Sequence, residues 1–341
     1  MWLQHRRAAR RSPARPDRGR HLSRGRPLTG GAAVATLVRE AALASCRLDV
    51  TAFKPGNVSL RSPGHGMTAE DFLTSAEAVA PILSASGLSL GRRVLMSVEA
   101  TRRAVGCNTN LGIVLLCAPL AQAALEAGVS RDWRPHLRAV LQALDVEDAR
   151  DVFQAIVLAS PAGLGQSGRH DVHEAPEVGL LEAMTEAAPR DRIAYQYAHE
   201  YADVRSLGLP CLHACTSRWA AREDRLEWAT VATYLAFLAR IPDTHLARKH
   251  GPDAALAVRR EAERVETGFK ACENPVNAIA LLQDFDNKLK RGGLNPGTSA
   301  DLTVASLLAF HLDHPLGDQL RGSAPEITTG PITVIRRKAR S

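Results

Sequence analysis

The sequence predicts an all-α fold, a single multi-helix domain that follows a disordered, arginine-rich N-terminal tail. Hydrophobic residues make up 45% of the 341 residues, which is enough for a large core. Aromatic residues are only 4% and alanine is abundant, and this composition favours helices over sheets. Apolar residues also recur at the three- and four-residue spacing of helices, between helix-capping signals.

The excess positive charge of the chain lies in its N-terminal tail. Residues 1–30 contain nine arginines and one acid, a charge of +8 against +7 for the whole chain, which leaves −1 for the remainder. The tail has no periodicity and is interrupted by Pro and Gly, so we expect disorder. It lacks the apolar segment of a secretory signal. Three interpretations of the tail remain open: a transit peptide, a nucleic-acid-binding arm, or an extension from an upstream start codon. We favour the last.

The helical signals are clear along most of the remaining chain. Residues 68–71 resemble a capping box in front of an apolar stripe over residues 72–83. Residues 94–105 repeat that spacing and end at Gly106, as a helix with a C-cap glycine would. Further helical patterns cover residues 226–238, 254–267 (ending at Gly268), 276–289 and 302–312. We therefore expect one helical domain over residues 31–320 and a C-terminal tail over 321–341, in which ITVI at 332–335 is the one candidate strand.

An uncharged segment over residues 104–125 raises the question of a membrane span. Asn108, Thr109 and Asn110 interrupt it, and the purely apolar run over residues 111–120 is too short to cross about 30 Å of hydrocarbon. We expect a buried core helix and no membrane contact. The near-neutral charge after residue 30 likewise disfavours nucleic acid as a partner.

The cysteines indicate reduced thiols in a cytoplasmic protein. Six of them are scattered along the chain without a C-x-x-C pair. Cys211, His213 and Cys215 have the types of side chain that ligate metals but lack a partner cluster, so we expect free thiols there. His170 and His173 have the spacing of metal ligands on a helix, but Gly and Pro flank them, so a metal pair and a solvated loop both remain open.

Four polar clusters interrupt the helices, at residues 48–59, 108–112, 242–251 and 292–305. In the last one, Thr298 or Ser299 would cap a helix starting near Ala300, whose free N–H groups would attract phosphate. Asp301 would repel that phosphate unless Mg²⁺ bridges the two. The four clusters together fit a site for a polyanion and a divalent cation.

In sequence order, the motifs KPGNV (54–58), NTNLG (108–112), PDTHLARKHG (242–251) and NPGTSADL (295–302) resemble the triphosphoribosyl-dephospho-CoA synthase family. The resemblance covers about residues 48–312. It implies an all-helical enzyme that joins the ribose C1 of ATP to the 2′-hydroxyl of 3′-dephospho-CoA and releases adenine. The product is the prosthetic-group precursor of citrate lyase and malonate decarboxylase.

The resemblance also implies roles for individual residues. Asp49, Glu99, Asp243 and Asp301 would be catalytic, with Asp243 and Asp301 also binding Mg²⁺, and Lys54 would contact phosphate. The remaining implied substrate and nucleotide contacts are Asn57, Asn108, Thr109, Asn110, Arg248, Lys249, Asn295, Gly297, Thr298 and Ser299.

The chain departs from citrate-lyase-type members of that family at several positions. It reads NTNLG where they read NTHKG, and it has DVH at 171–173 where they carry a Gly-Ala-Arg-Gly-Glu-Ala loop. These variants resemble the branch found in archaea and methylotrophs, so a different acceptor, such as a pterin-type precursor of a one-carbon cofactor, is a further hypothesis. A nucleotide or sugar-phosphate hydrolase and a non-catalytic nucleotide-binding homologue also remain open.

Overall fold

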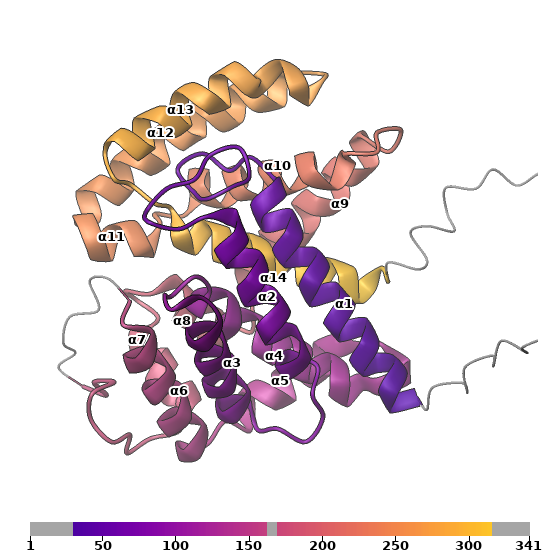
Figure 1. Cartoon of the computed structure of the whole chain (residues 1–341), viewed down its shortest axis with the longest axis vertical. Coiled ribbons are helices and arrows are strands. Elements are labelled where there is room, and N and C mark those ends of the chain that lie inside the picture. Colours follow the sequence, from indigo (N-terminus) through magenta and orange to yellow (C-terminus); the bar gives the residue numbers. More distant parts are fainter. Residues whose placement is uncertain (1–29, 162–168, 316–341) are drawn as a thin grey trace, which may run out of the picture.

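The computed structural model describes residues 30–161 and 169–315 (Figure 1). Within those ranges the chain forms no strand and fourteen α-helices: α1 (Gly30–Thr51), α2 (Ala69–Leu83), α3 (Leu90–Val105), α4 (Leu111–Ala127), α5 (Trp133–Gln142), α6 (Val146–Ala159), α7 (Leu180–Ala187), α8 (Arg192–Ala198), α9 (Leu209–Arg218), α10 (Arg225–Arg240), α11 (Thr244–His250), α12 (Pro252–Ala271), α13 (Ile279–Arg291) and α14 (Gly297–Asp313). The all-α prediction is confirmed. Apart from Gly30, the predicted N-terminal tail lies outside the described residues, as do the C-terminal tail and its candidate strand.

Local sequence signals set several helix ends. At the start of α2, Thr68 Oγ1 accepts from Asp71 N at 3.3 Å and Asp71 Oδ2 accepts from Thr68 N at 2.7 Å, so the predicted capping box is confirmed. Gly106 ends α3 with a φ of 73°, as predicted. The expected stop at Gly268 is wrong, because α12 continues to Ala271. That glycine instead allows close packing, since a Cβ there would lie 2.7 Å from Leu281 Cδ2.

Two hydrophobic clusters form the core. The larger one surrounds α4 and α14, where Val114, Leu116 and Leu307 are fully buried. The smaller one joins α10, α12 and α13 around side chains such as Tyr234 and Phe269. Figure 1 shows α12 and α13 lying along one end of the molecule and α3, α6 and α7 at the other, with α14 between them. The beginning of α14 therefore lies between two halves of the molecule, one containing α12 and α13 and the other containing α3, α6 and α7.

Helix α4 contains the apolar run that raised the question of a membrane span. Among the described residues, Leu111–Ser130 is the one segment long and apolar enough to cross a membrane, and 67% of its 18-residue apolar window is buried inside the protein. It packs against α1, α3, α5 and α14. These contacts are those of a core helix, as its sequence predicts.

Candidate functional site

A cavity of about 790 Å³ opens between the two halves, within the roughly 300–1,000 Å³ range of small-molecule sites. Its walls come from the loop after α1, the first turns of α4, α8 and α14, and parts of α6, α7 and α11. Segments distant in sequence thus meet at one place. Of the predicted site residues, those lining the cavity are Asp49, Asn57, Asn108, Thr109, Asn110, Arg248, Lys249, Asn295, Gly297, Thr298 and Asp301.

Asp301 on α14 lies against the first turn of α4. A Cβ added to Gly112 would overlap Asp301 Oδ2, so only glycine allows this approach. The half-buried Asp301 carboxylate has no hydrogen bond or ion pair with any described residue. Burial raises its pKa well above the ordinary value, and the nearby charges of Asp49 and Asp243 raise it further. The cavity therefore contains a carboxyl group whose ionised form would be stabilised by a cationic partner.

A buried polar chain holds the loop after α1. Lys54 Nζ lies 2.9 Å from Asp49 Oδ1, an ion pair without hydrogen-bond alignment, and donates to Asn57 Oδ1 at 2.6 Å. Asn57 Nδ2 in turn donates to Asn295 Oδ1 at 2.9 Å. The Lys54 side chain is 0% exposed and does not line the cavity, so the structure does not bring this predicted phosphate contact into the cavity. The lysine instead neutralises Asp49 and orients the two amides.

Asp243 joins the starts of two helices. Its Oδ1 caps α11 by accepting from Leu246 N at 3.0 Å, and its Oδ2 accepts from Ser299 N at 2.8 Å and Ser299 Oγ at 2.9 Å. The side chain is buried and, like Ser299, does not line the cavity. The carboxylate therefore occupies the first turn of α14, where the sequence predicted phosphate. Both oxygens of Asp243, which was predicted to be catalytic and metal-binding, accept from backbone and hydroxyl donors of the protein itself, so the structure gives this side chain a structural role.

The Asn-Thr-Asn cluster combines capping with cavity lining. Asn108 Oδ1 accepts from Leu111 N, the first N–H group of α4, at 3.1 Å, whereas Asn110 is the N-cap residue and makes no capping bond with its side chain. Thr109 Oγ1 lies 2.7 Å from Ser75 Oγ, and Asn110 Oδ1 accepts from Thr101 Oγ1 at 2.9 Å. The cluster is thus fixed by its neighbours as it faces the cavity.

Basic side chains gather along another part of the lining. Arg190, Arg248 and Lys249 line the cavity together with His65 and His245. Burial lowers the pKa of His245 to about 4, and the nearby charges of Arg248 and Lys249 lower it further. This His is therefore neutral near pH 7, whereas the Arg and Lys side chains provide positive charge for an anionic ligand.

Sequence reasoning did not select His65, Arg190 or Asp191 as site residues, and it included His245 only as part of the polar cluster at residues 242–251. Asp191 Oδ1 caps α8 by accepting from Ile193 N at 2.8 Å, and its Oδ2 lies 3.3 Å from Arg248 Nη1. An aspartate shortly after a proline and before an apolar residue is a readable N-cap signal. Its role in holding Arg248, which is distant in sequence, has no local signal.

The rest of the lining is largely apolar. Phe72, Phe153, Ile156, Met184 and Ile193 contribute side chains from α2, α6, α7 and α8. This composition, an apolar wall with a few charged and amide groups, is typical of sites that bind a flat or hydrocarbon part of a ligand and orient its polar part.

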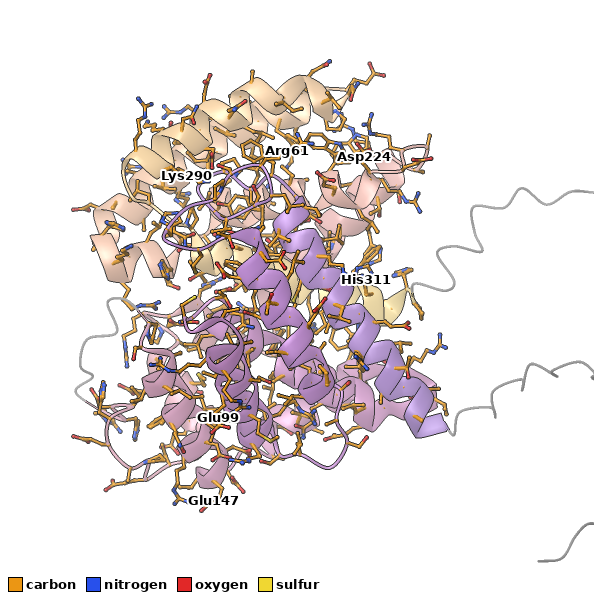
Figure 2. All side chains as sticks on the ribbon, viewed as in Figure 1. Arg61, Glu99, Glu147, Asp224, Lys290 and His311 are labelled. Atoms are coloured by element: carbon orange, nitrogen blue, oxygen red, sulfur yellow. The ribbon has the colours of Figure 1, made fainter. Side chains whose placement is uncertain are left out.

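Of two further sequence predictions, Glu99 lies away from the cavity and the His170/His173 pair lies only partly in it. Glu99 is on α3 (Figure 2), 3.8 Å from Arg103, and does not line the cavity, so the structure does not bring this predicted catalytic residue to the site. His170 lines the cavity from a loop, whereas His173 Nδ1 lies 2.7 Å from Asp171 Oδ1. The residues described contain no group of three or more His, Cys, Asp or Glu side chains placed to hold a metal ion.

A magnesium ion bound mainly by phosphates would need few ligands from the cavity. Mg²⁺ is commonly held by one or two carboxylates together with substrate phosphates and water, rather than by an all-protein cage. Asp49 is already paired with Lys54, whereas Asp301 has no such partner among the described residues. Asp301 is therefore the carboxylate suited to this contact.

Comparisons with known proteins agree on one family. The sequence model described as "CitG: ATP:dephospho-CoA triphosphoribosyl transferase" matches residues 35–319. A protein of Pectobacterium carotovorum subsp. carotovorum (strain PC1), named "Probable 2-(5''-triphosphoribosyl)-3'-dephosphocoenzyme-A synthase", is 30% identical over 133 residues, which span 39% of this chain and 37% of that protein. A crystal structure from Archaeoglobus fulgidus, of a protein named as a candidate triphosphoribosyl-dephospho-CoA synthase, is similar with a TM-score of 0.54 and 25% identity, over 71% of this chain and 98% of that one.

Proposed function

Because this chain belongs to the family of ATP:dephospho-CoA triphosphoribosyl transferases, which are pentosyltransferases, we propose that it moves the 5-triphosphoribosyl group of ATP to the 2′-hydroxyl of 3′-dephospho-CoA and releases adenine. The observation that carries this proposal is the placement of Asp301, an unpaired carboxylate among the described residues, in a cavity that also holds basic, amide and apolar groups.

Asp301 is suited to the charge that this reaction develops. Loss of adenine from the ribose C1 builds positive charge on the sugar, and a carboxylate facing that charge stabilises the transition state. Burial opposes ionisation of Asp301 in the free protein, which raises its pKa. A developing cation would favour the ionised form. The carboxylate therefore binds the transition state better than the ground state, which is what accelerates a reaction.

The basic side chains would bind the triphosphate. Arg190, Arg248 and Lys249 supply the positive charge, and Asp191 holds Arg248 through the contact at 3.3 Å. Since the triphosphate does not react, its binding energy serves to position the sugar. Mg²⁺ bound to the phosphates would neutralise further negative charge.

The amides and the apolar wall would position the two organic parts. Asn57 and Asn295 are fixed to each other at 2.9 Å and line the cavity, so they can hydrogen-bond sugar hydroxyls without reorganising. The apolar side chains, Phe153 and Met184 among them, offer surface to a purine ring.

The experiment that tests this function is adenine release from Mg²⁺-ATP by the purified protein, measured with 3′-dephospho-CoA, with a pterin-type precursor and with no acceptor. Release that depends on 3′-dephospho-CoA supports the proposal. Release only with the pterin-type precursor would change the acceptor, release without any acceptor would indicate a hydrolase, and ATP binding without release would indicate a binding protein. Each of the last three outcomes contradicts the proposal.

A further inference from the structure

The loop after α1 (residues 52–68) forms part of the cavity wall. It contributes Asn57, His65, Gly66 and Met67 to the lining. The same loop also contacts α13, a fully described helix none of whose residues lines the cavity (Figure 1). The loop therefore connects the cavity to a helix outside it.

The first half of this loop is a tight turn over residues 54–57. Asn57 N donates to Lys54 O at 3.0 Å, and Gly56 has a φ of 81°, the positive value that a type II turn requires after Pro55. The turn leaves the N–H group of Gly56 unused. Asp286 on α13 supplies its acceptor, since Asp286 Oδ1 accepts from Gly56 N at 2.7 Å. The Asp286 carboxylate is buried, so this bond is shielded from water.

The turn also packs closely on its neighbours. A Cβ added to Gly56 would lie 2.7 Å from Leu289 Cδ1 on α13 and 2.9 Å from Pro296 Cδ, just before α14. The position of the turn therefore depends on the position of α13.

The second half of the loop contains a turn over residues 64–67. Met67 N donates to Gly64 O at 3.1 Å, and both central residues have positive φ, 57° for His65 and 75° for Gly66, as in a type I′ turn. A positive φ is uncommon for a residue with a side chain, and it persists where the surroundings impose it. One such contact joins His65 Nε2 to Gly56 O at 2.9 Å, and because a carbonyl only accepts, the imidazole donates.

The other contacts come from α13. Lys290 Nζ donates to Ser62 O at 2.7 Å and to Pro63 O at 3.0 Å, and it also donates to Ser62 Oγ. Ser62 Oγ in turn donates to Asp286 Oδ2 at 2.6 Å. Lys290 Nζ lies 3.6 Å from Asp286 Oδ1, so the two side chains also form an ion pair. Asp286 and Lys290 thus hold both turns of the loop.

We propose that Asp286 and Lys290 are positioning residues for the transfer reaction, which hold the loop after α1 from outside the cavity so that Asn57 and His65 keep a fixed place in its wall. This inference rests on the proposed function. Groups that are already in place need no reorganisation when the reaction occurs, which favours the transition state.

The placement of the basic side chains makes the effect on turnover separable from the effect on ATP binding. Arg190, Arg248 and Lys249 line the cavity from segments other than this loop. Displacement of the loop should therefore lower kcat and leave most of the affinity for the triphosphate unchanged.

Asp286→Ala removes the acceptor of Gly56 N and of Ser62 Oγ together. We expect kcat to fall by about 100-fold, the effect of a displacement of roughly 1 Å in a site, while the Kd for ATP changes by less than about threefold. Asp286→Asn retains an oxygen for Gly56 N, and its amide can donate to Ser62 Oγ, so kcat should return to within about tenfold of the wild type.

Lys290→Met provides a second variant, which leaves the carboxylate in place. It removes the donor to Ser62 and Pro63 and should lower kcat by about tenfold. Lys288→Met is the matched control on the same helix. Lys288 Nζ is exposed and pairs with Glu261 Oε2 at 2.6 Å, so its loss should leave kcat and the loop unchanged.

The test uses the full-length protein and three measurements on each variant. Adenine release from Mg²⁺-ATP with 3′-dephospho-CoA gives kcat, calorimetry gives the Kd and stoichiometry for ATP, and hydrogen exchange with mass spectrometry reports on peptides covering residues 54–67. We expect exchange in these peptides to be faster by about tenfold in Asp286→Ala and unchanged in Lys288→Met. Circular dichroism and thermal melting establish that each variant is folded.

A wild-type kcat in Asp286→Ala, or an Asp286→Asn variant no more active than Asp286→Ala, would overturn the proposal. A parallel loss of kcat and of ATP-binding stoichiometry would overturn it as well, because it would indicate partial unfolding. The exchange measurement needs no turnover, so wild-type protection of the loop in Asp286→Ala refutes the anchoring whatever the reaction. Absence of adenine release by the wild type refutes the proposed function and any role in it, and exchange then decides the anchoring alone.

Discussion

Replacement of Lys54 by Met gives the sharpest test of the buried polar chain. Methionine has a similar length but carries no charge, so the substitution leaves Asp49, which is 2% exposed, without its ion-pair partner. Breaking a buried pair from one side costs about 3–5 kcal/mol. Loss of the 2.6 Å hydrogen bond to Asn57 adds about 1 kcal/mol. We therefore expect Lys54→Met to lower the free energy of unfolding by about 4–6 kcal/mol.

The matched control removes both charges. In the Asp49→Asn/Lys54→Met double variant no charge is left buried, and replacing a whole buried pair is often close to neutral. We expect it to recover at least half of the stability that Lys54→Met loses, and urea unfolding at pH 7 measures all the variants. A loss below about 1 kcal/mol for Lys54→Met would refute the reasoning. A variant of normal stability with a raised KM for ATP would restore the phosphate contact that the sequence suggested for Lys54.

Three further predictions concern the cavity. Gly112→Ala should displace the Asp301 carboxylate, lower kcat by about 100-fold and lower the free energy of unfolding by about 1–3 kcal/mol. A variant with the wild-type kcat would contradict the close approach of Gly112 to Asp301. Because the folded pKa of Asp301 is raised above the unfolded one, the native state binds more protons, so stability falls as pH rises from about 4 through the folded pKa. Asp301→Asn should therefore have a higher melting temperature than the wild type at pH 8, and this difference should shrink towards pH 4. A difference that grows towards pH 4 would contradict the prediction. Glu99→Gln should leave kcat unchanged and stability within about 0.5 kcal/mol, since its ion pair with Arg103 is exposed; a large loss of kcat would return Glu99 to the site.

The helices that the sequence predicted best have local end signals. The capping box at Thr68 and Asp71 and the glycine at position 106 act through neighbouring backbone groups, so they could be recognised without the fold. Helix α1 has no acidic residue in its first turn and no basic residue in its last turn, and it was not predicted as an element. The glycine at position 268 was misread, because its role is contact with Leu281 on another helix, which spacing does not reveal.

For the site too, the sequence predicted some features and missed others. Motif position correctly brought Asn57, Asn110, Asn295 and Asp301 to one cavity. It did not indicate which polar groups are used up by the protein itself. Asp243 and Lys54 have the residue types expected of ligand contacts, and only the packing of α11 against α14 and of the loop after α1 shows that their partners are internal.

The same limit applies to the proposed cation site. A sequence contains Asp243 and Asp301 as equivalent carboxylates near helix starts, but the structure gives one of them three donors and the other none among the described residues. That difference depends on burial and on helix contacts, and it decides which carboxylate is left for a ligand.

The most direct test of the proposed transfer is the mass of the product formed from Mg²⁺-ATP and 3′-dephospho-CoA by the wild-type protein and by Asp301→Asn. We predict that the wild type adds one triphosphoribosyl group to 3′-dephospho-CoA for each adenine released, and that Asp301→Asn still binds ATP but forms no product. Product formation by Asp301→Asn at the wild-type rate, or adenine release by the wild type with unmodified 3′-dephospho-CoA, would contradict the account.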